Sequence, residues 1–328
     1  MTLPMFDVKN RSMRHMSAVV TLALAGGVSL PASADEGGVA FWFSGQYASL
    51  AAVPATPGAS LVLSPYYYNG EADDSKSFPK GEAINAGLDA SVPLMLAQLG
   101  YAFDTKILGG RPYLGMAWGV GKSRTSADVT VSPLGVELAR SDTTSGGTDL
   151  YPFASLAWDK GNNNWMTYLT GDIPVGAYDS KRLANLGIGH AAVDAGAGYT
   201  YLDSTSGREF SAVAGVTYNW ENSDTDYQNG IDSHIDWAAS QFLSANWQVG
   251  IVGYVYYQLT GDSGSGAKLG SFKSRVASAG PEVGYLFKFN GQEAYVNVRG
   301  YYEFWADNRL EGYSAFATIS LPLGKAGK

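Results

Sequence analysis

A period-two alternation of apolar and polar residues runs through most of this chain and constrains its fold more than any other feature. Between residues 209 and 221, Phe210, Val216 and Trp220 share one face of an extended chain, whereas Glu209 and Thr217 share the other. Successive side chains of a β-strand point to opposite faces, so this pattern predicts a strand with two different surroundings. Helical periodicity is nearly absent. About twelve segments show the alternation: 59–69, 85–103, 112–121, 148–158, 163–175, 192–203, 209–221, 232–243, 246–260, 272–287, 293–304 and 313–321.

The connections between these segments alternate in length. The longer, polar set is 70–84, 122–147, 176–191, 222–231, 261–271 and 305–312. The shorter set, with turn residues such as Asn-Gly, is 104–111, 159–162, 204–208, 244–245 and 288–292. Short turns at one end, long loops at the other and an even strand number are typical of outer-membrane barrels. The sequence therefore predicts an all-β fold, a transmembrane antiparallel β-barrel of about 12 strands over 59–328. A soluble β-sandwich is the alternative, because alternation alone does not separate a lipid-facing surface from a packed core.

Aromatic residues fall at the predicted strand ends. Trp158 and Trp165 flank a short turn, Trp220 and Trp305 end strands on the long-loop side, and Tyr66 to Tyr68 end the first strand. Amphipathic rings favour the level of the lipid headgroups, so these positions predict two aromatic girdles.

Composition excludes several classes of protein. The chain has no cysteine, which rules out disulfide scaffolds, thiol nucleophiles and zinc–cysteine sites. Lys and Arg number 22 against 30 Asp and Glu, which argues against nucleic acid as a partner. Beyond the N-terminus no run of about 18 apolar residues occurs, so a helical membrane bundle is excluded.

Residues 1–34 are expected to form a secretory signal peptide. Lys9, Arg11 and Arg14 precede an apolar core at 16–30, and the small residues of Ala32-Ser33-Ala34 predict cleavage before Asp35. We expect this cleavable signal to direct the chain to the outer membrane of a Gram-negative cell.

Residues 35–58 precede the first strand and are rich in Gly, Ala and Pro. This segment is either a plug inside the barrel, which we favour, or an ordered lead-in. Pro93 and Pro281 fall inside strand patterns. Since proline donates no ladder hydrogen bond, each predicts a bulge.

Five stretches resemble an outer-membrane family associated with the meta-cleavage pathway of phenol degradation and related to fatty-acid and toluene channels. They are 37–58, 181–203, 225–244, 254–287 and 314–324. The run Thr260-Gly-Asp-Ser-Gly-Ser-Gly-Ala-Lys-Leu-Gly270 is the most specific of them. The resemblance implies a barrel that passes hydrophobic or aromatic compounds by diffusion. Fatty-acid-type channels have a kinked strand that opens a lateral exit, so the resemblance also implies a lateral opening at Pro93 or Pro281 as the alternative to a simple bulge.

If apolar positions face lipid, the opposite positions line the lumen, because a charged side chain facing lipid at mid-membrane costs about 2–4 kcal/mol. The candidate residues along the substrate path are Asp89, Asp172, Asp194, Glu209, Asp236, Tyr254, Tyr256, Arg275, Glu282, Arg299, Tyr301 and Glu303. Arg299 and Glu303 lie four apart on one strand face. They are expected to form a lumenal salt-bridge ladder, or alternatively a charged constriction.

Catalytic and metal chemistry have weaker support. His234 lies two residues from both Asp232 and Asp236, which leaves a barrel hydrolase as a minor alternative. The carboxylates of 222–236 lack the spacing of a calcium loop. No cofactor, metal site or enzymatic activity is expected.

The sequence predicts an outer-membrane channel for passive uptake of small hydrophobic or aromatic compounds. A closed structural or adhesion barrel, with the Ser/Thr-rich loop 122–147 as its contact surface, is the alternative. The expected partners are outer-membrane lipid, the small ligand, periplasmic chaperones and the barrel-assembly machinery.

Overall fold

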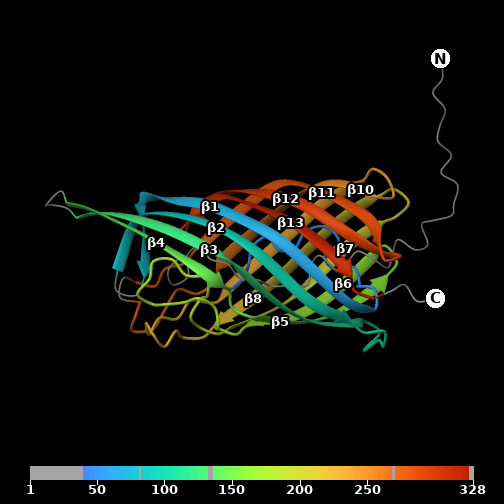
Figure 1. Ribbon diagram of the computed structural model, residues 1–328, viewed down its shortest axis with the longest axis horizontal. Coiled ribbons are helices and arrows are strands. Elements are labelled where there is room, and N and C mark those ends of the chain that lie inside the picture. The colour runs from blue at the N-terminus through green and yellow to red at the C-terminus, as the bar shows by residue number, and fades with distance from the viewer. Residues whose placement is uncertain (1–39, 81–82, 132–135, 268–269, 325–328) are drawn as a thin grey trace, which may run out of the picture.

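The computed structural model describes residues 40–80, 83–131, 136–267 and 270–324, and within these ranges it contains antiparallel strands and no helix. None of the described segments is a helix long and apolar enough to span a membrane. The strands are β1 (Gly58–Lys80), β2 (Ala83–Ala102), β3 (Arg111–Val131), β4 (Val136–Gly147), β5 (Tyr151–Lys160), β6 (Asn163–Asp172), β7 (Ala192–Asp203), β8 (Arg208–Asn219), β9 (Asp232–Phe242), β10 (Trp247–Gln258), β11 (Arg275–Phe289), β12 (Gln292–Asp307) and β13 (Glu311–Pro322). Figure 1 shows them inclined around one common axis.

Twelve of these strands close into a barrel, as the sequence predicts. The ring closes where β1 pairs with β13, in a register that places Leu61 opposite Leu321. Residues 111–117 of β3 pair with β5, and residues 120–131 of the same strand pair with β4. Because β4 pairs only with β3 among the described strands, it lies outside the ring.

Alternating burial along each strand defines the two surfaces of the barrel. In β6, Trp165 and Leu169 are about half exposed, whereas Met166 and Tyr168 between them are buried. The outward-facing side chains form an apolar belt around the barrel. Each strand of the closed ring pairs on both sides, so no strand edge with unpaired backbone groups faces lipid. Polar side chains that would be costly in lipid are therefore confined to the interior.

Two of the loops predicted from sequence are strands instead. Residues 70–80 and 83–84 extend β1 and β2, and residues 122–131 and 136–147 form the hairpin of β3 and β4, which projects beyond the ring (Figure 1). Strands outside a membrane need no apolar face. The run Lys122-Ser-Arg-Thr-Ser126 is entirely polar, so it lacks the apolar–polar alternation by which strands were predicted.

Neither Pro93 nor Pro281 forms the predicted bulge. Both are exposed on the outer face, and the pairing register is the same on either side of each proline. The register of β11 and β12 shifts instead between Arg275 and Ala277, where Trp305 has a positive φ of 61°.

Candidate functional site

The lumen of the barrel is filled by the chain itself. Residues 40–57, called the plug from here on, run through the interior in Figure 1, ahead of β1. Phe41, Trp42 and Phe43 of the plug are at most 4% exposed. The plug has no regular secondary structure, so its backbone polar groups must find partners on the barrel wall.

Asp236, Arg299 and Tyr301 hold the middle of the plug. The Asp236 carboxylate accepts hydrogen bonds from the backbone N–H groups of Gly45 (3.1 Å) and Tyr47 (3.2 Å). Arg299 Nε donates to the Gly45 carbonyl at 3.1 Å, and the Tyr301 hydroxyl donates to the same oxygen at 3.0 Å. Gly45 has φ +81°, and a Cβ there would lie 2.9 Å from the Tyr301 ring. This turn therefore requires glycine for its conformation and for space.

A second set of side chains holds the plug nearer the short-turn end. Glu209 accepts a hydrogen bond from the Leu50 N–H at 2.9 Å. Thr200 Oγ1 accepts from the Ala52 N–H at 2.9 Å, and Arg111 donates to the Ala55 carbonyl at 2.7 Å. Hydrogen bonds between the backbone of the plug and side chains of the barrel strands therefore recur along the plug.

The plug inserts two aromatic side chains into opposite parts of the wall. The Trp42 ring stacks on His234 with centroids 3.3 Å apart and planes 14° apart. The Phe43 ring contacts Tyr66 at 4.4 Å and Phe316 at 5.0 Å between centroids, both edge-on. A cavity of about 40 Å³ adjoins Phe43. On the order of two or three water molecules fill such a volume, so the lumen beside Phe43 has no room for an aromatic compound.

His234 belongs to a buried polar cluster with Asp194. The Asp194 carboxylate accepts hydrogen bonds from Tyr168 (2.7 Å) and Thr217 (2.6 Å), and His234 Nε2 lies 3.1 Å from it. His234 thus pairs with Asp194 on another strand rather than with Asp232 or Asp236, the carboxylates considered for a hydrolase. Trp42 covers the imidazole face.

A third group of contacts lies toward the long-loop end. Glu303 accepts hydrogen bonds from Tyr68 (3.0 Å) and Tyr254 (2.7 Å) and is 3.9 Å from Arg309. The predicted ladder between Arg299 and Glu303 is therefore wrong, because Arg299 binds the plug and Glu303 pairs with Arg309. No group of three or more metal-ligating side chains occurs in the part of the chain that the structure describes.

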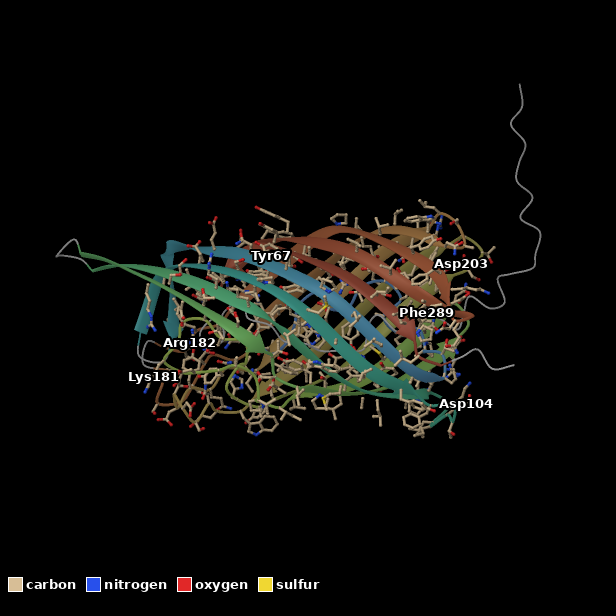
Figure 2. All side chains as sticks on the ribbon, viewed as in Figure 1. Tyr67, Asp104, Lys181, Arg182, Asp203 and Phe289 are labelled. Atoms are coloured by element: carbon tan, nitrogen blue, oxygen red, sulfur yellow. The ribbon has the colours of Figure 1, made fainter. Side chains whose placement is uncertain are left out.

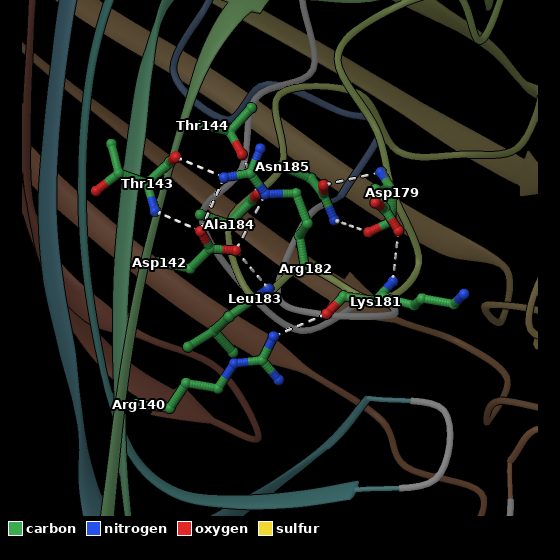
Figure 3. Close-up of polar contacts among 10 residues, drawn as sticks. All are labelled: Arg140, Asp142, Thr143, Thr144, Asp179, Lys181, Arg182, Leu183, Ala184 and Asn185. Carbon is green, nitrogen blue, oxygen red and sulfur yellow. Dashed lines mark hydrogen bonds and ion pairs between the residues drawn. The ribbon is translucent and has the colours of Figure 1, made fainter.

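Loop 173–191 folds back over this end of the barrel and is fastened to β4. Arg182 donates to Asp142 at 2.9 and 3.2 Å, and the Leu183 N–H donates to the same carboxylate at 3.1 Å (Figure 3). We call Asp142 and Arg182 the clasp. These hydrogen bonds hold the pKa of Asp142 well below its usual range. Figure 2 places Arg182 at the end of the molecule opposite Asp203, which lies beside a short turn.

Ten of the predicted path residues are buried inside the barrel: Asp172, Asp194, Glu209, Asp236, Tyr254, Tyr256, Glu282, Arg299, Tyr301 and Glu303. Asp89 is a correction, since it is exposed on the outer face near Ser126, in the projecting part of β2. In this part of β2 the apolar side chains face the interior, and the polar side chain of Asp89 faces outward. The inward residues of β2, such as Val92 and Leu94, are apolar and belong to the same buried cluster as Phe41 and Phe43.

Arg275 is the second correction. It lies at the start of β11 with its side chain 38% exposed, 3.4 Å from Asp307 and over the Trp305 ring. Glu282 faces inward on the same strand, and the pairing of β11 with β10 is continuous from Glu282 to Arg275, so the odd-numbered Arg275 faces outward.

Sequence reasoning placed Tyr254, Tyr256 and Tyr301 inside the barrel correctly but misplaced Tyr66 and Tyr68. Tyr66 and Tyr68 are buried in the lumen, whereas only Tyr67 between them is exposed, so Tyr66 and Tyr68 do not belong to a girdle. The Tyr-Tyr-Tyr run has no alternation that indicates which ring faces which side.

A closed twelve-stranded ring with an apolar outer belt and a polar, plugged interior defines an outer-membrane-type β-barrel. The fold is similar to the COG4313 outer membrane channel from Pseudomonas putida F1 (TM-score 0.63, 14% identity, 80% of this chain and 95% of that chain). Lower similarity is found to the beta domain of the Bordetella autotransporter BrkA (TM-score 0.48, 13% identity, 81% and 100%). It is also found to a Pseudomonas aeruginosa FadL homologue (TM-score 0.37, 11% identity, 92% and 96%).

The chain belongs to the family described as "Putative MetA-pathway of phenol degradation", which matches residues 72–319. This match confirms the resemblance found in the sequence. No curated protein sequence matches the chain.

Proposed function

We propose that this protein is an outer-membrane channel for passive uptake of small hydrophobic or aromatic compounds. Family membership and the barrel fold support the proposal. The observation that carries it is the plug, a non-covalent stopper whose own Trp42 and Phe43 rings occupy aromatic surroundings inside the lumen. A lumen that holds aromatic side chains of the chain itself offers the same contacts to aromatic solutes.

Passage would require the plug to move, because the cavity beside Phe43 is smaller than a monoaromatic compound. The forces to be overcome are hydrogen bonds between backbone groups of the plug and side chains of the wall, which re-form after each passage. Such a cycle runs down a concentration gradient and requires no cofactor. The further expectations belong to the same proposal: signal cleavage before Asp35, insertion by chaperones and assembly machinery, and residence in outer-membrane lipid.

Uptake of labelled phenol and toluene tests the proposal. Cells that lack the gene are compared with cells that re-express it, after heat-modifiable gel migration has verified a folded barrel. Slower uptake on deletion and recovery on re-expression are expected. Uptake that is unchanged by deletion would overturn the channel.

A disulfide tests whether the plug must move. The chain contains no cysteine, and the Ser49 and Ser240 hydroxyl oxygens are 3.0 Å apart, one on the plug and one on β9. The S49C/S240C pair should stop uptake when oxidised and restore it when reduced, while each single cysteine serves as its matched control. Equal uptake by the oxidised and reduced forms would show that compounds pass without displacing this part of the plug.

The projecting hairpin of β3 and β4 favours adhesion as a second candidate function. Deleting 123–144, which lies in this hairpin, should abolish surface attachment but leave uptake intact if adhesion is the role. Loss of neither would remove this candidate.

A further inference from the structure

The ring of Phe43 fills a slot in the barrel wall that suits any aromatic group. Its two wall residues, Tyr66 and Phe316, meet it at interplanar angles of 71° and 65°, and both are buried. Edge-to-face contacts at these separations depend on the ring quadrupole and not on the covalent attachment of the ring. The ring of a ligand would make the same contacts once Phe43 has left.

The cavity beside this slot is lined by both apolar and polar side chains. Val62 and Leu96 contribute apolar surface, whereas Gln98, Arg299 and Thr318 contribute polar groups. Thr318 Oγ1 is within hydrogen-bond distance of Arg299 Nη1 (3.2 Å) and of Ser64 Oγ (2.7 Å). Hydrogen-bonding groups and hydrocarbon therefore border the same cavity.

Arg299 brings a buried positive charge to this cavity. Its side chain is 3% exposed, and the guanidinium lies 4.1 Å from the centroid of Phe316. Its hydrogen-bond acceptors are neutral, including the carbonyls of Gly45 and Gln46. Within the described ranges of the chain, none of the ion pairs involves Arg299. Glu282 nevertheless stands opposite Arg299 in the register of β11 and β12, and Asn297 bridges the two side chains, donating to Glu282 and accepting from Arg299, each at 3.1 Å. Because a carboxylate already lies close to the guanidinium, Arg299 favours a neutral hydrogen-bond acceptor beside it over a second anion.

We propose that the Phe43 slot and its cavity form a binding subsite for a monoaromatic ligand that carries a neutral hydrogen-bond acceptor, namely a phenol. The inference deepens the proposed function and rests on it, since the ligand must enter the lumen to reach the slot. The ring displaces Phe43 between Tyr66 and Phe316, and the ligand oxygen faces Arg299 and Thr318. Toluene fills the slot but offers no acceptor to these donors, so it binds more weakly.

The F43A variant tests the subsite by emptying the slot without touching the polar residues. Purified F43A barrel in lipid nanodiscs is titrated with 4-fluorophenol and with fluorobenzene, and binding is followed by ¹⁹F NMR. We expect 4-fluorophenol to bind at least about tenfold tighter, the factor for one hydrogen bond to a charged donor. Adding T318V should reduce the preference to about twofold, because it removes one hydroxyl and keeps the side-chain shape.

F41A is the matched control, since it makes the same change two residues away, where the ring faces Tyr151 at 6.2 Å. Equal affinity of F43A for the two compounds, or the same preference in F41A, overturns the subsite. If F43A yields no folded barrel, T318V in the otherwise unchanged chain decides by uptake. A fall in the phenol-to-toluene uptake ratio supports the subsite, and an unchanged ratio overturns it.

The two proposals fail in different ways. Phenol-selective binding by F43A together with uptake that is independent of the gene would refute the channel and support the subsite. Gene-dependent uptake together with unselective binding would refute the subsite and leave the channel.

Discussion

The plug and the clasp both hold an irregular segment against β-strands, but they do so in opposite surroundings. At the plug, Asp236 is 1% exposed and binds two backbone N–H groups. At the clasp, the side chains of Arg182 and Asp142 are 42% and 17% exposed. A contact of given geometry is strong where water cannot replace it and weak where water and salt compete. The difference assigns the closure of the lumen to buried hydrogen bonds between plug backbone and wall side chains rather than to the ion pair outside.

Loop 173–191 shows the same contrast within one element. Its outer side is held by the clasp, whereas its inner side is held by Asp149, which accepts hydrogen bonds from the N–H groups of Gly176 (2.6 Å) and Ile188 (2.8 Å). Burial raises the pKa of Asp149, while the half-buried Asp142 has its pKa lowered by hydrogen bonds from Arg182. We therefore expect the loop to loosen at its outer edge before it leaves the barrel.

Asp236→Ala should give the largest effect, since it leaves two buried N–H groups of the plug without acceptors. The expected loss is about 2–5 kcal/mol of plug binding, enough to leave the lumen open in a large fraction of molecules. Planar-bilayer recordings should then show frequent, long openings that the unchanged protein lacks. Asp224→Asn, on an exposed loop, is the control and should leave the conductance unchanged. A closed Asp236→Ala barrel would refute the assignment of closure to this residue.

Gly45→Ala should have the next largest effect. It combines a positive φ with a clash against Tyr301, which we expect to weaken the plug by about 1–2 kcal/mol. Gly161→Ala is matched in φ (+73°) but meets no atom within 4 Å and lies on the short turn between β5 and β6, so it is the control for a strained backbone away from the plug. Bilayer openings more frequent in Gly45→Ala than in Gly161→Ala are expected. Equal behaviour of the two variants would mean that neither the turn at Gly45 nor its contact with Tyr301 constrains the plug.

Acidification should weaken the packing of loop 173–191 at the long-loop end of the barrel, through protonation of His190. Burial lowers the pKa of His190, whose Nε2 lies 3.1 Å from the Asn229 amide and whose Nδ1 lies 3.0 Å from the Ala191 carbonyl. A lowered pKa means that the contact is intact above about pH 6.5, the unperturbed value, and is lost as the pH falls below it. Amide hydrogen exchange in 220–231, corrected for intrinsic rates, should therefore rise between pH 7.5 and 5.5. His190→Gln should abolish this pH dependence, and a rise that persists in the variant would exclude His190 as its cause.

The barrel was predictable from sequence because lipid and lumen impose a two-residue period on each spanning strand. Glu209 and Tyr254 were assigned inward from that period, and both are buried in the lumen. The period fails where the membrane no longer acts, as at Asp89 and in the projecting 122–131, and where the plug makes the interior apolar, as at Val92 and Leu94. The contacts of the plug follow no local rule, since Gly45 and Asp236 are 191 residues apart. The sequence therefore suggested a plug but not the residues that hold it.

Arg182→Gln should give the smallest effect, which sharpens the contrast with Asp236. An exposed ion pair contributes little and is screened by salt, so we expect trypsin to cleave after Lys181 about threefold faster than in the unchanged protein at low salt. The difference should shrink as salt is added. The clasp also requires ionised Asp142, whose lowered pKa keeps it intact above about pH 4 and releases it as the pH falls further.

Lys181→Gln, which removes the cleavage site but keeps the clasp, identifies the bond that is cut. Arg140→Gln is the second control, because it removes a hydrogen bond to the Lys181 carbonyl (2.8 Å) while Asp142 and Arg182 stay paired. A salt-dependent increase in Arg182→Gln that is absent from Arg140→Gln would assign the screened contribution to the ion pair. If Arg182→Gln instead opened the lumen as Asp236→Ala is expected to do, the surface contact would control closure and the distinction between the two regions would fail.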